Sequence, residues 1–319
     1  QSDAGRRLKV RRSRAQVERA KPECSPEPVA SDCSLQLCDV RLATFQPSGA
    51  VVLRTRVLVA VILIPLVIGL LYVGGIPWLS GVLLAGVLAW REMATILRRK
   101  PFAADRVLGL FFIVGLIADA YLRSLPSWHF DLLRPLLVAF IIISLLLTLH
   151  DRGAQPTADW GVTVACALYL GITLSYLVVL RQRSNGFAWA AVTFIVTWTC
   201  DTAAYFVGRA WGKHLWWPRI SPRKTWEGLA GGAAGALGVG ALLGAGWLGL
   251  PWAQAGLLGA LVAVVAPFGD LAESLFKRQA NVKDSSRLIP GHGGVLDRLD
   301  SLLFVFPVIT YFALIIAGA

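Results

Sequence analysis

Charge is scarce in this chain of 319 residues: 16% of them are Asp, Glu, Lys or Arg, while 56% are hydrophobic. Soluble domains carry about 25% charged residues, so this composition argues against a soluble globular protein. Cysteine is also scarce, with five residues scattered along the chain and no Cys-x-x-Cys pair. The sequence therefore supports neither a zinc site nor a disulfide framework.

Long apolar runs take the place of the missing charge. Several of them reach ~20 residues, the length of helix that crosses ~30 Å of hydrocarbon. We therefore expect an all-α, polytopic integral membrane protein with about nine transmembrane helices. The predicted spans are 57–74, 77–97, 106–124, 133–149, 160–180, 187–208, 228–249, 253–276 and 299–318.

The net charge of +12 comes from bases that fall mostly in loops and in the N-terminal tail. In a membrane protein this pattern indicates a positive-inside bias and contact with anionic lipid or nucleotide, and we expect no nucleic-acid partner. With the N-terminus inside, four basic sets face the cytosol, whereas Arg181 and Arg183 fall on the opposite side. The four sets are Arg54 with Arg56, residues 98–100, residues 209–224 and residues 277–298.

The stretch from Asp270 to Asp300 concentrates acids, bases and glycines between two apolar runs. Asp270, Ser274 and Lys277 share one face if the first run ends as a helix. The Pro-Gly-His-Gly-Gly segment 290–294 cannot continue a helix and predicts a turn. Asp297 and Asp300 then lie three residues apart on the next helix, so the stretch predicts two helices joined by a polar turn.

Carboxylates that converge from two helices repel one another unless a cation lies between them, and Mg²⁺ is the usual one. The bases of this stretch add a field that attracts anions. Acids for a metal together with bases for phosphates are what phosphoryl or nucleotidyl transfer requires. The bases are Lys277, Arg278, Lys283, Arg287 and Arg298.

Residues 274–300 read S-x-F-K-R-x4-K-D-x-S-x2-I-P-x-H-G-G-V-x-D-R-L-D. This pattern resembles the signature of the phosphatidate cytidylyltransferases, also called CDP-diacylglycerol synthases. The resemblance covers about 54–319 and implies that CTP and phosphatidate give CDP-diacylglycerol and pyrophosphate for phospholipid biosynthesis. It also implies a multi-pass protein of the bacterial inner membrane with its active-site loops in the cytosol.

With this resemblance, we assign Asp270 and Asp297 to a Mg²⁺ site, with Asp300 as a third, weaker candidate. Lys277, Arg278 and Arg298 would neutralise the triphosphate or the leaving pyrophosphate. His292 would either donate to a phosphate oxygen or hold the turn. Ser274 and Lys283 complete the substrate-binding candidates of this stretch. A second, monovalent cation stays open, and a homodimer is an expectation drawn only from the size of the enzyme.

Two segments outside the signature also carry candidate residues. Asp201 is an acid within the sixth apolar run, so its side chain should face a polar cavity, a cation or another helix rather than lipid. The family shows a similar Asp-Thr-x-Ala-Tyr segment. Ser221, Arg223 and Lys224 resemble a family segment that precedes a span, and we expect Ser221 to cap a helix whose N–H groups face an anion.

Two further features are given structural interpretations. Glu92, near the cytosolic end of the second span, is interpreted as the partner of Arg91 or of a loop base in a salt bridge. The glycines from Gly231 to Gly244 form a small-residue face that favours close helix packing. A nucleotide-binding glycine loop is rejected there, because the pattern lies inside a span and follows no strand.

Other functions are kept as alternatives. A CTP-dependent lipid kinase would use the same charges but release CDP, and a close variant would activate a different lipid phosphate. A transporter is less favoured, since transporters place their site at the midplane of repeated halves, whereas here the charges gather at span ends.

Residues 1–50 are polar, rich in Arg, Ser and Pro, and include a basic cluster at 6–12. We interpret them as a disordered, basic extension that contacts anionic lipid, ahead of a membrane-embedded cytidylyltransferase domain at 51–319. The rival hypothesis is that translation starts at Val51 or Val52, close to the Leu-Arg-Thr-Arg that precedes the first span. The intact mass of the protein expressed from its own promoter separates the two, because only the rival predicts a chain without the extension.

Overall fold

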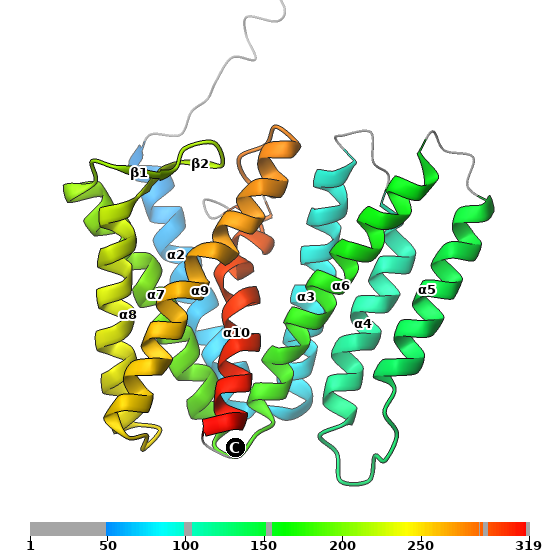
Figure 1. The fold of residues 1–319 in the computed structure, drawn as a ribbon, viewed down its shortest axis with the longest axis horizontal. Coiled ribbons are helices and arrows are strands. Elements are labelled where there is room, and N and C mark those ends of the chain that lie inside the picture. Colours follow the sequence, from blue (N-terminus) through cyan, green and yellow to red (C-terminus); the bar gives the residue numbers. More distant parts are fainter. Residues whose placement is uncertain (1–48, 99–103, 151–154, 287, 290–292, 317–319) are drawn as a thin grey trace, which may run out of the picture. The chain divides into compact units, whose positions relative to one another are not determined.

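The computed structural model describes residues 49–98, 104–150, 155–286, 288–289 and 293–316. These residues are mostly helical (Figure 1), with one short antiparallel hairpin between the sixth and seventh predicted spans. The helices are α2 (Gly49–Val73), α3 (Gly75–Leu97), α4 (Arg106–Leu122), α5 (Leu133–His150), α6 (Pro156–Arg181), α7 (Gly186–Trp211), α8 (Trp226–Gly246), α9 (Trp252–Gln279) and α10 (Leu296–Ile316), and the strands are β1 (Leu215–Trp217) and β2 (Ser221–Thr225).

Each predicted span coincides with one helix, and the all-α, polytopic membrane fold is confirmed. Seven of the described helices, α3 and α5–α10, are long and apolar enough to cross a membrane. Helix α4 has 17 residues and α2 contributes the shorter apolar segment Val61–Val73. The total of nine spans therefore stays a prediction. The disorder expected for residues 1–50 also stays one, because residues 1–48 lie outside the described part.

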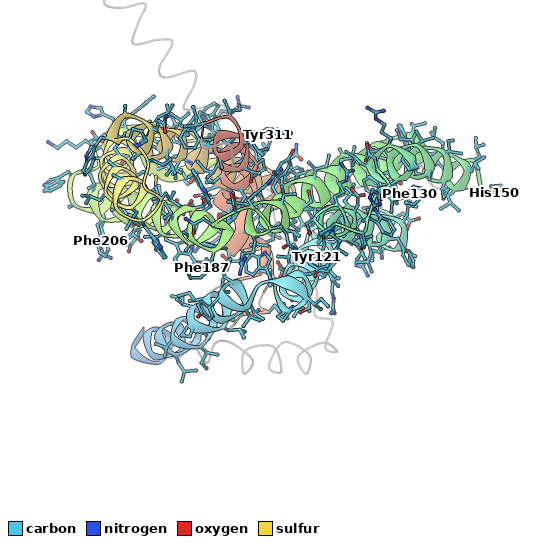
Figure 2. The ribbon with its side chains drawn as sticks, turned by 90° about the horizontal axis from the view of Figure 1, so that it is seen from below. Tyr121, Phe130, His150, Phe187, Phe206 and Tyr311 are labelled. Carbon is cyan, nitrogen blue, oxygen red and sulfur yellow. The ribbon has the colours of Figure 1, made fainter. Side chains whose placement is uncertain are left out.

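Helix α5 shows how this fold meets lipid. Only Phe140 and Ser144 are buried on it, and most of its other apolar side chains are exposed, as expected for a helix that faces hydrocarbon. In Figure 2, which looks along the helices, His150 at the end of α5 lies at the outer edge of the helices. Burial instead concentrates in α3, α6, α7, α9 and α10.

Helices α7, α8 and α9 pack closely through small residues. A Cβ at Gly240 of α8 would lie 2.6 Å from the Cα of Gly259 on α9, and one at Gly232 would lie 2.9 Å from the carbonyl oxygen of Cys200 on α7. Real Cβ atoms do not approach that closely, so these positions have room for glycine only. The small-residue face predicted for 231–244 thus brings three backbones into direct contact.

Arg181 explains one exception in the charge pattern. Its guanidinium donates from Nε to the carbonyl oxygen of Leu71 at 2.6 Å and from NH2 to that of Tyr72 at 3.0 Å. These carbonyls belong to the last turn of α2, where a helix leaves its carbonyl groups without partners. The base therefore stabilises a helix end, which accounts for its place opposite the predicted cytosolic side.

The glycine packing predicts that two substitutions on α9 differ in their effect on stability. Gly259→Ala should lower the melting temperature in detergent, because the new Cβ would lie 2.5 Å from the carbonyl oxygen of Ala236. Overpacking of this kind costs typically 1–3 kcal/mol. Gly256→Ala is the matched control, since nothing lies within 4 Å of its Cβ position. Equal melting temperatures for the two variants would contradict the proposed packing.

Candidate active site

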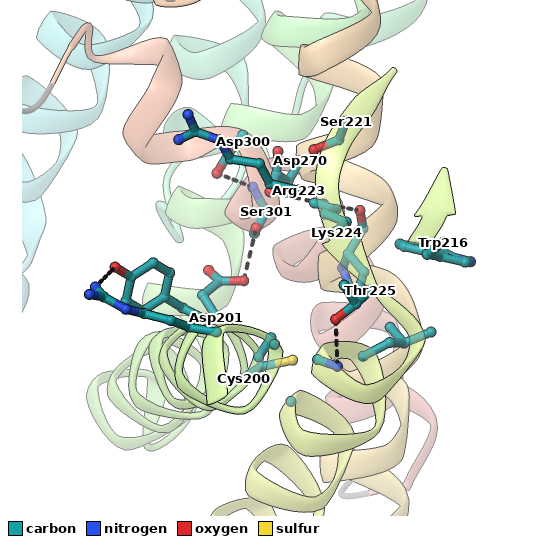
Figure 3. A pocket seen from close by; sticks show the side chains of 18 of the residues that line it. Cys200, Asp201, Trp216, Ser221, Arg223, Lys224, Thr225, Asp270, Asp300 and Ser301 are labelled. Carbon is teal, nitrogen blue, oxygen red and sulfur yellow. Dashed lines mark hydrogen bonds and ion pairs between the residues drawn. The ribbon is translucent and has the colours of Figure 1, made fainter. Parts of the chain in front are cut away.

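A cavity of about 580 Å³ opens among α7, α8, α9, α10 and the hairpin. One side is apolar, formed by small residues of α7 and α8 such as Ala204, Gly228 and Gly232. The other side is polar and charged. Figure 3 shows these polar side chains converging from separate elements. Among them are Asp201, Ser221, Arg223, Lys224, Asp270, Asp297, Arg298, Asp300 and Ser301.

Three carboxylates of this cavity come from three different helices: Asp201 from α7, Asp270 from α9 and Asp300 from α10. Asp300 is close enough to the other two for their charges to repel. Asp201 accepts a long hydrogen bond from the Ser301 hydroxyl at 3.5 Å, and the charges of Lys224 and Arg298 offset part of the repulsion. A cluster of this kind has a strong attraction for a cation.

Lys224 supplies the nearest positive charge. Its Nζ lies 2.9 Å from Asp270 Oδ2 and donates to the carbonyl oxygen of Pro267 at 3.1 Å. The side chain reaches α9 because strand β2 lies beside that helix, where Trp216 of β1 contacts Phe268 edge to face. The ammonium also lies 5.9 Å from the centre of the Trp216 ring, a cation–π distance.

The segment before α8 differs from our expectation. Ser221, Arg223 and Lys224 lie in strand β2, so the prediction that Ser221 caps a helix is wrong. Thr225 is the cap instead, and its side-chain oxygen accepts from the Gly228 N–H at 3.1 Å. A threonine with an extended backbone fulfils the N-cap role as well as a serine does. Ser221, Arg223 and Lys224 nevertheless line the cavity.

Asp297 is held differently from the other acids. Its Oδ1 lies 2.8 Å from Lys277 Nζ, while Oδ2 accepts from the N–H groups of Ser285 and Gly294 at 2.9 and 2.8 Å. The Ser285 hydroxyl is a further neighbour of Oδ2, at 2.8 Å. Both oxygens of Asp297 thus have protein donors, and Oδ2 alone has three donor neighbours, which leaves this carboxylate less available to a metal ion than Asp201 or Asp300.

Lys277 is largely enclosed, with 11% of its side chain exposed. Besides Asp297 it contacts Glu273 Oε1 at 3.0 Å, one turn earlier on α9. Glu273 is fully buried and was missed by our sequence analysis, although a glutamate within a span is a recognised signal of function or pairing. Lys277 therefore pairs with one carboxylate on α9 and with another on α10. It is not one of the described residues that line the cavity.

Glu92 corrects a second expectation. Among the described residues the predicted salt bridge with Arg91 or a loop base is not found, because the four described partners of this buried carboxylate are hydroxyl and backbone N–H groups. It accepts from the hydroxyls of Ser285 and Ser286 and from the N–H groups of Val295 and Leu296, at 2.6 to 3.1 Å. An acid in an apolar helix was the available signal, but the sequence could not show which segment it meets.

The remaining candidates have varied positions. Ser274 is buried and donates to Asp270 Oδ1 at 3.2 Å, which orients that carboxylate. Arg278 donates from Nε to the carbonyl oxygen of Ile220 at 3.1 Å and so ties the hairpin to α9. Arg298 is exposed and lines the cavity, and Lys283 is exposed outside its lining. His292 and Arg287 lie outside the described residues.

The donor chemistry fits Mg²⁺ if a substrate contributes ligands. Within the part of the chain that the structure describes, no group of three His, Cys, Asp or Glu side chains is arranged to hold a metal unaided. Mg²⁺ is commonly bound by one or two carboxylates together with water and substrate phosphates. Repelling carboxylates beside a space large enough for phosphates meet that requirement, so a metal ion and an anionic substrate would bind together.

Comparison with known proteins gives a consistent result. Residues 54–316 match the model of the Cytidylyltransferase family. The phosphatidate cytidylyltransferase of Brucella suis is 35% identical over 289 residues, which cover 83% of this chain and 94% of that protein. The enzymes of the same name from Staphylococcus saprophyticus and Bacillus subtilis are 33% and 32% identical, covering 81% and 82% of this chain and 97% of each relative. The chain therefore belongs to the cytidylyltransferase family.

Proposed function

We propose that this chain transfers the cytidylyl group of CTP to phosphatidate, giving CDP-diacylglycerol and pyrophosphate. One observation carries the proposal: in a chain of this family, a single cavity joins four carboxylates, three of which lie on separate helices, to Arg223, Lys224 and Arg298. Carboxylates suit a metal that binds a nucleotide, and bases suit phosphates. Small, apolar residues of α7 and α8 form the rest of the wall, as a lipid substrate requires.

The reaction needs little acid–base chemistry. A phosphate oxygen of phosphatidate attacks the α-phosphorus of CTP, and the bond from that phosphorus to the oxygen bridging to the β-phosphate breaks. The electron pair leaves with pyrophosphate. Because the attacking oxygen is already anionic near neutral pH, positioning and charge neutralisation account for most of the rate enhancement.

The carboxylates of Asp201, Asp270 and Asp300 would hold Mg²⁺ together with the phosphates of CTP. The metal would neutralise charge that develops as pyrophosphate leaves. Ser274 keeps the Asp270 carboxylate oriented, and the network around Lys277 and Asp297 fixes the start of α10, on which Asp300 lies. In this proposal Asp297 is a positioning residue, which differs from the ligand role that the sequence suggested.

The basic residues have different proposed roles according to where they lie. Lys224 and Arg298 lie on opposite elements of the cavity and would bind the phosphates of the two substrates, with Arg223 and Ser221 beside Lys224 on β2. Arg278 contributes indirectly because it holds the hairpin. Hairpin and signature turn would face the cytosol, where CTP is available. Figure 1 supports this arrangement, since the hairpin and the C-terminal end of α9 both lie at the end of the helices opposite the C-terminal end of α10.

The first experiment follows the label of CTP in purified protein supplied with phosphatidate in detergent. With α-labelled CTP we expect label in the lipid phase, and with γ-labelled CTP we expect labelled pyrophosphate, both abolished by EDTA and restored by Mg²⁺. Release of CDP with the γ-label transferred to lipid would instead identify a lipid kinase. Activity that persists in EDTA would contradict the metal site.

Removing one cavity carboxylate should inactivate the enzyme without unfolding it. For Asp270→Asn and Asp300→Asn we expect turnover to fall at least ~100-fold, taking ~3 kcal/mol per lost electrostatic contact to the transition state as the scale. Asp131→Asn is the matched control, since Asp131 is an exposed acid outside both the signature and the cavity lining. Initial rates on monodisperse protein are the measurement, and near-wild-type turnover in either cavity variant would refute its assignment.

A further inference from the structure

Glu92 lies on α3, which contributes none of the residues that line the cavity, yet its carboxylate contacts the segment that leads into the site. Its side chain is 5% exposed. Oε1 accepts from the Ser286 hydroxyl at 2.6 Å and from the Val295 N–H at 3.1 Å. Oε2 accepts from the Leu296 N–H at 2.9 Å and lies 3.0 Å from the Ser285 hydroxyl.

This contact supplies something that α10 lacks. A helix begins with N–H groups that have no partner within the helix, and a side-chain oxygen just before its first turn usually accepts from them. Here the residues before Leu296 are Gly293, Gly294 and Val295, none of which carries such an oxygen. Glu92 of a distant helix provides the acceptor, and its negative charge suits the positive end of the helix dipole.

Glycine at position 294 allows this approach. A Cβ there would collide with the Ser285 hydroxyl and with the Glu92 carboxylate. The Gly294 N–H in turn donates to Asp297 Oδ2. The helix start is therefore held from both sides, by Asp297 within α10 and by Glu92 across the fold.

The Ser285 hydroxyl links these two acids. Its oxygen lies 3.0 Å from Glu92 Oε2 and 2.8 Å from Asp297 Oδ2, so its one proton is shared between them. Asp297 continues to Lys277 on α9. Through this chain of contacts the Glu92 carboxylate on α3 restrains the start of α10, where Arg298 and Asp300 line the cavity.

We propose that Glu92 is a positioning residue of the reaction: it fixes the first turn of α10 and thereby the place of Asp300 and Arg298. The inference rests on the proposed function for its kinetic consequence, but its structural part can be tested without turnover. Glu92→Gln keeps the size of the side chain but replaces one acceptor oxygen by an N–H donor. The hydrogen bonds that this oxygen accepts are therefore lost.

The control is Asp119→Asn. Asp119 is also a buried acid of a helix, 4% exposed and paired with Arg123 at 2.7 Å, but it lies outside the cavity lining. Both variants thus lose a buried acid for an amide, and a general loss of stability would affect both. Melting temperature and elution profile establish that each is folded before any rate is compared.

Two readouts then decide. Hydrogen exchange of peptides covering 285–299, in full-length protein in lipid nanodiscs, should speed up in Glu92→Gln and stay unchanged in Asp119→Asn. In the CTP and phosphatidate assay, kcat of Glu92→Gln should fall ~10- to 100-fold, the range found for residues that orient metal ligands. Because transition-state alignment is lost, kcat should change more than KM. Asp119→Asn should retain its kcat.

Unchanged exchange in Glu92→Gln would overturn the proposal, and so would faster exchange with undiminished kcat. If the wild type is inactive, the proposed function alone is refuted. The exchange result would still test the contact between Glu92 and the start of α10. If Glu92→Gln fails to fold, Ser286→Ala removes only the shortest of the four contacts. It should give a smaller loss of kcat and faster exchange in the same peptides, and wild-type behaviour in both would again overturn the proposal.

Discussion

A charge placed inside this group of helices needs a partner within the protein, because lipid provides none, and two such pairs at the site join separate elements. Asp270 on α9 finds Lys224 on the hairpin, and Asp297 on α10 finds Lys277 on α9. Since each contact joins two elements, satisfying the charges also fixes the relative positions of those elements. The polar contacts and the close packing of glycines therefore have complementary roles: the polar contacts hold the helix ends that carry the site, and the glycines hold the apolar lengths.

The two groups of acids in the site are satisfied to different degrees. Asp297 and Glu92 are surrounded by donors, so they are structurally complete as they stand. Asp201 and Asp300 have fewer described donors, and their charges repel each other and that of Asp270. This contrast underlies the roles proposed above, and it cannot be seen from the spacing of acids in the signature alone.

The sequence allowed much of the fold to be predicted, because runs of ~20 apolar residues leave little choice in a bilayer. The glycine face of α8 was also readable, since only close packing explains so many small residues on one helix. The hairpin was not, because its strands are held by tertiary contact of Trp216 with Phe268 rather than by a local pattern. Glu92 was misread because its partners lie about two hundred residues away along the chain.

The order of the helices along the chain bears on how this protein is made. During synthesis α7 enters the membrane long before α10, so Asp201 is inserted before the Ser301 hydroxyl that donates to it exists. Asp270 differs, since the hairpin bearing Lys224 is translated ahead of α9. Until α10 is made, the hairpin with Lys224 is therefore the part of the chain that can offset the charges of both Asp201 and Asp270.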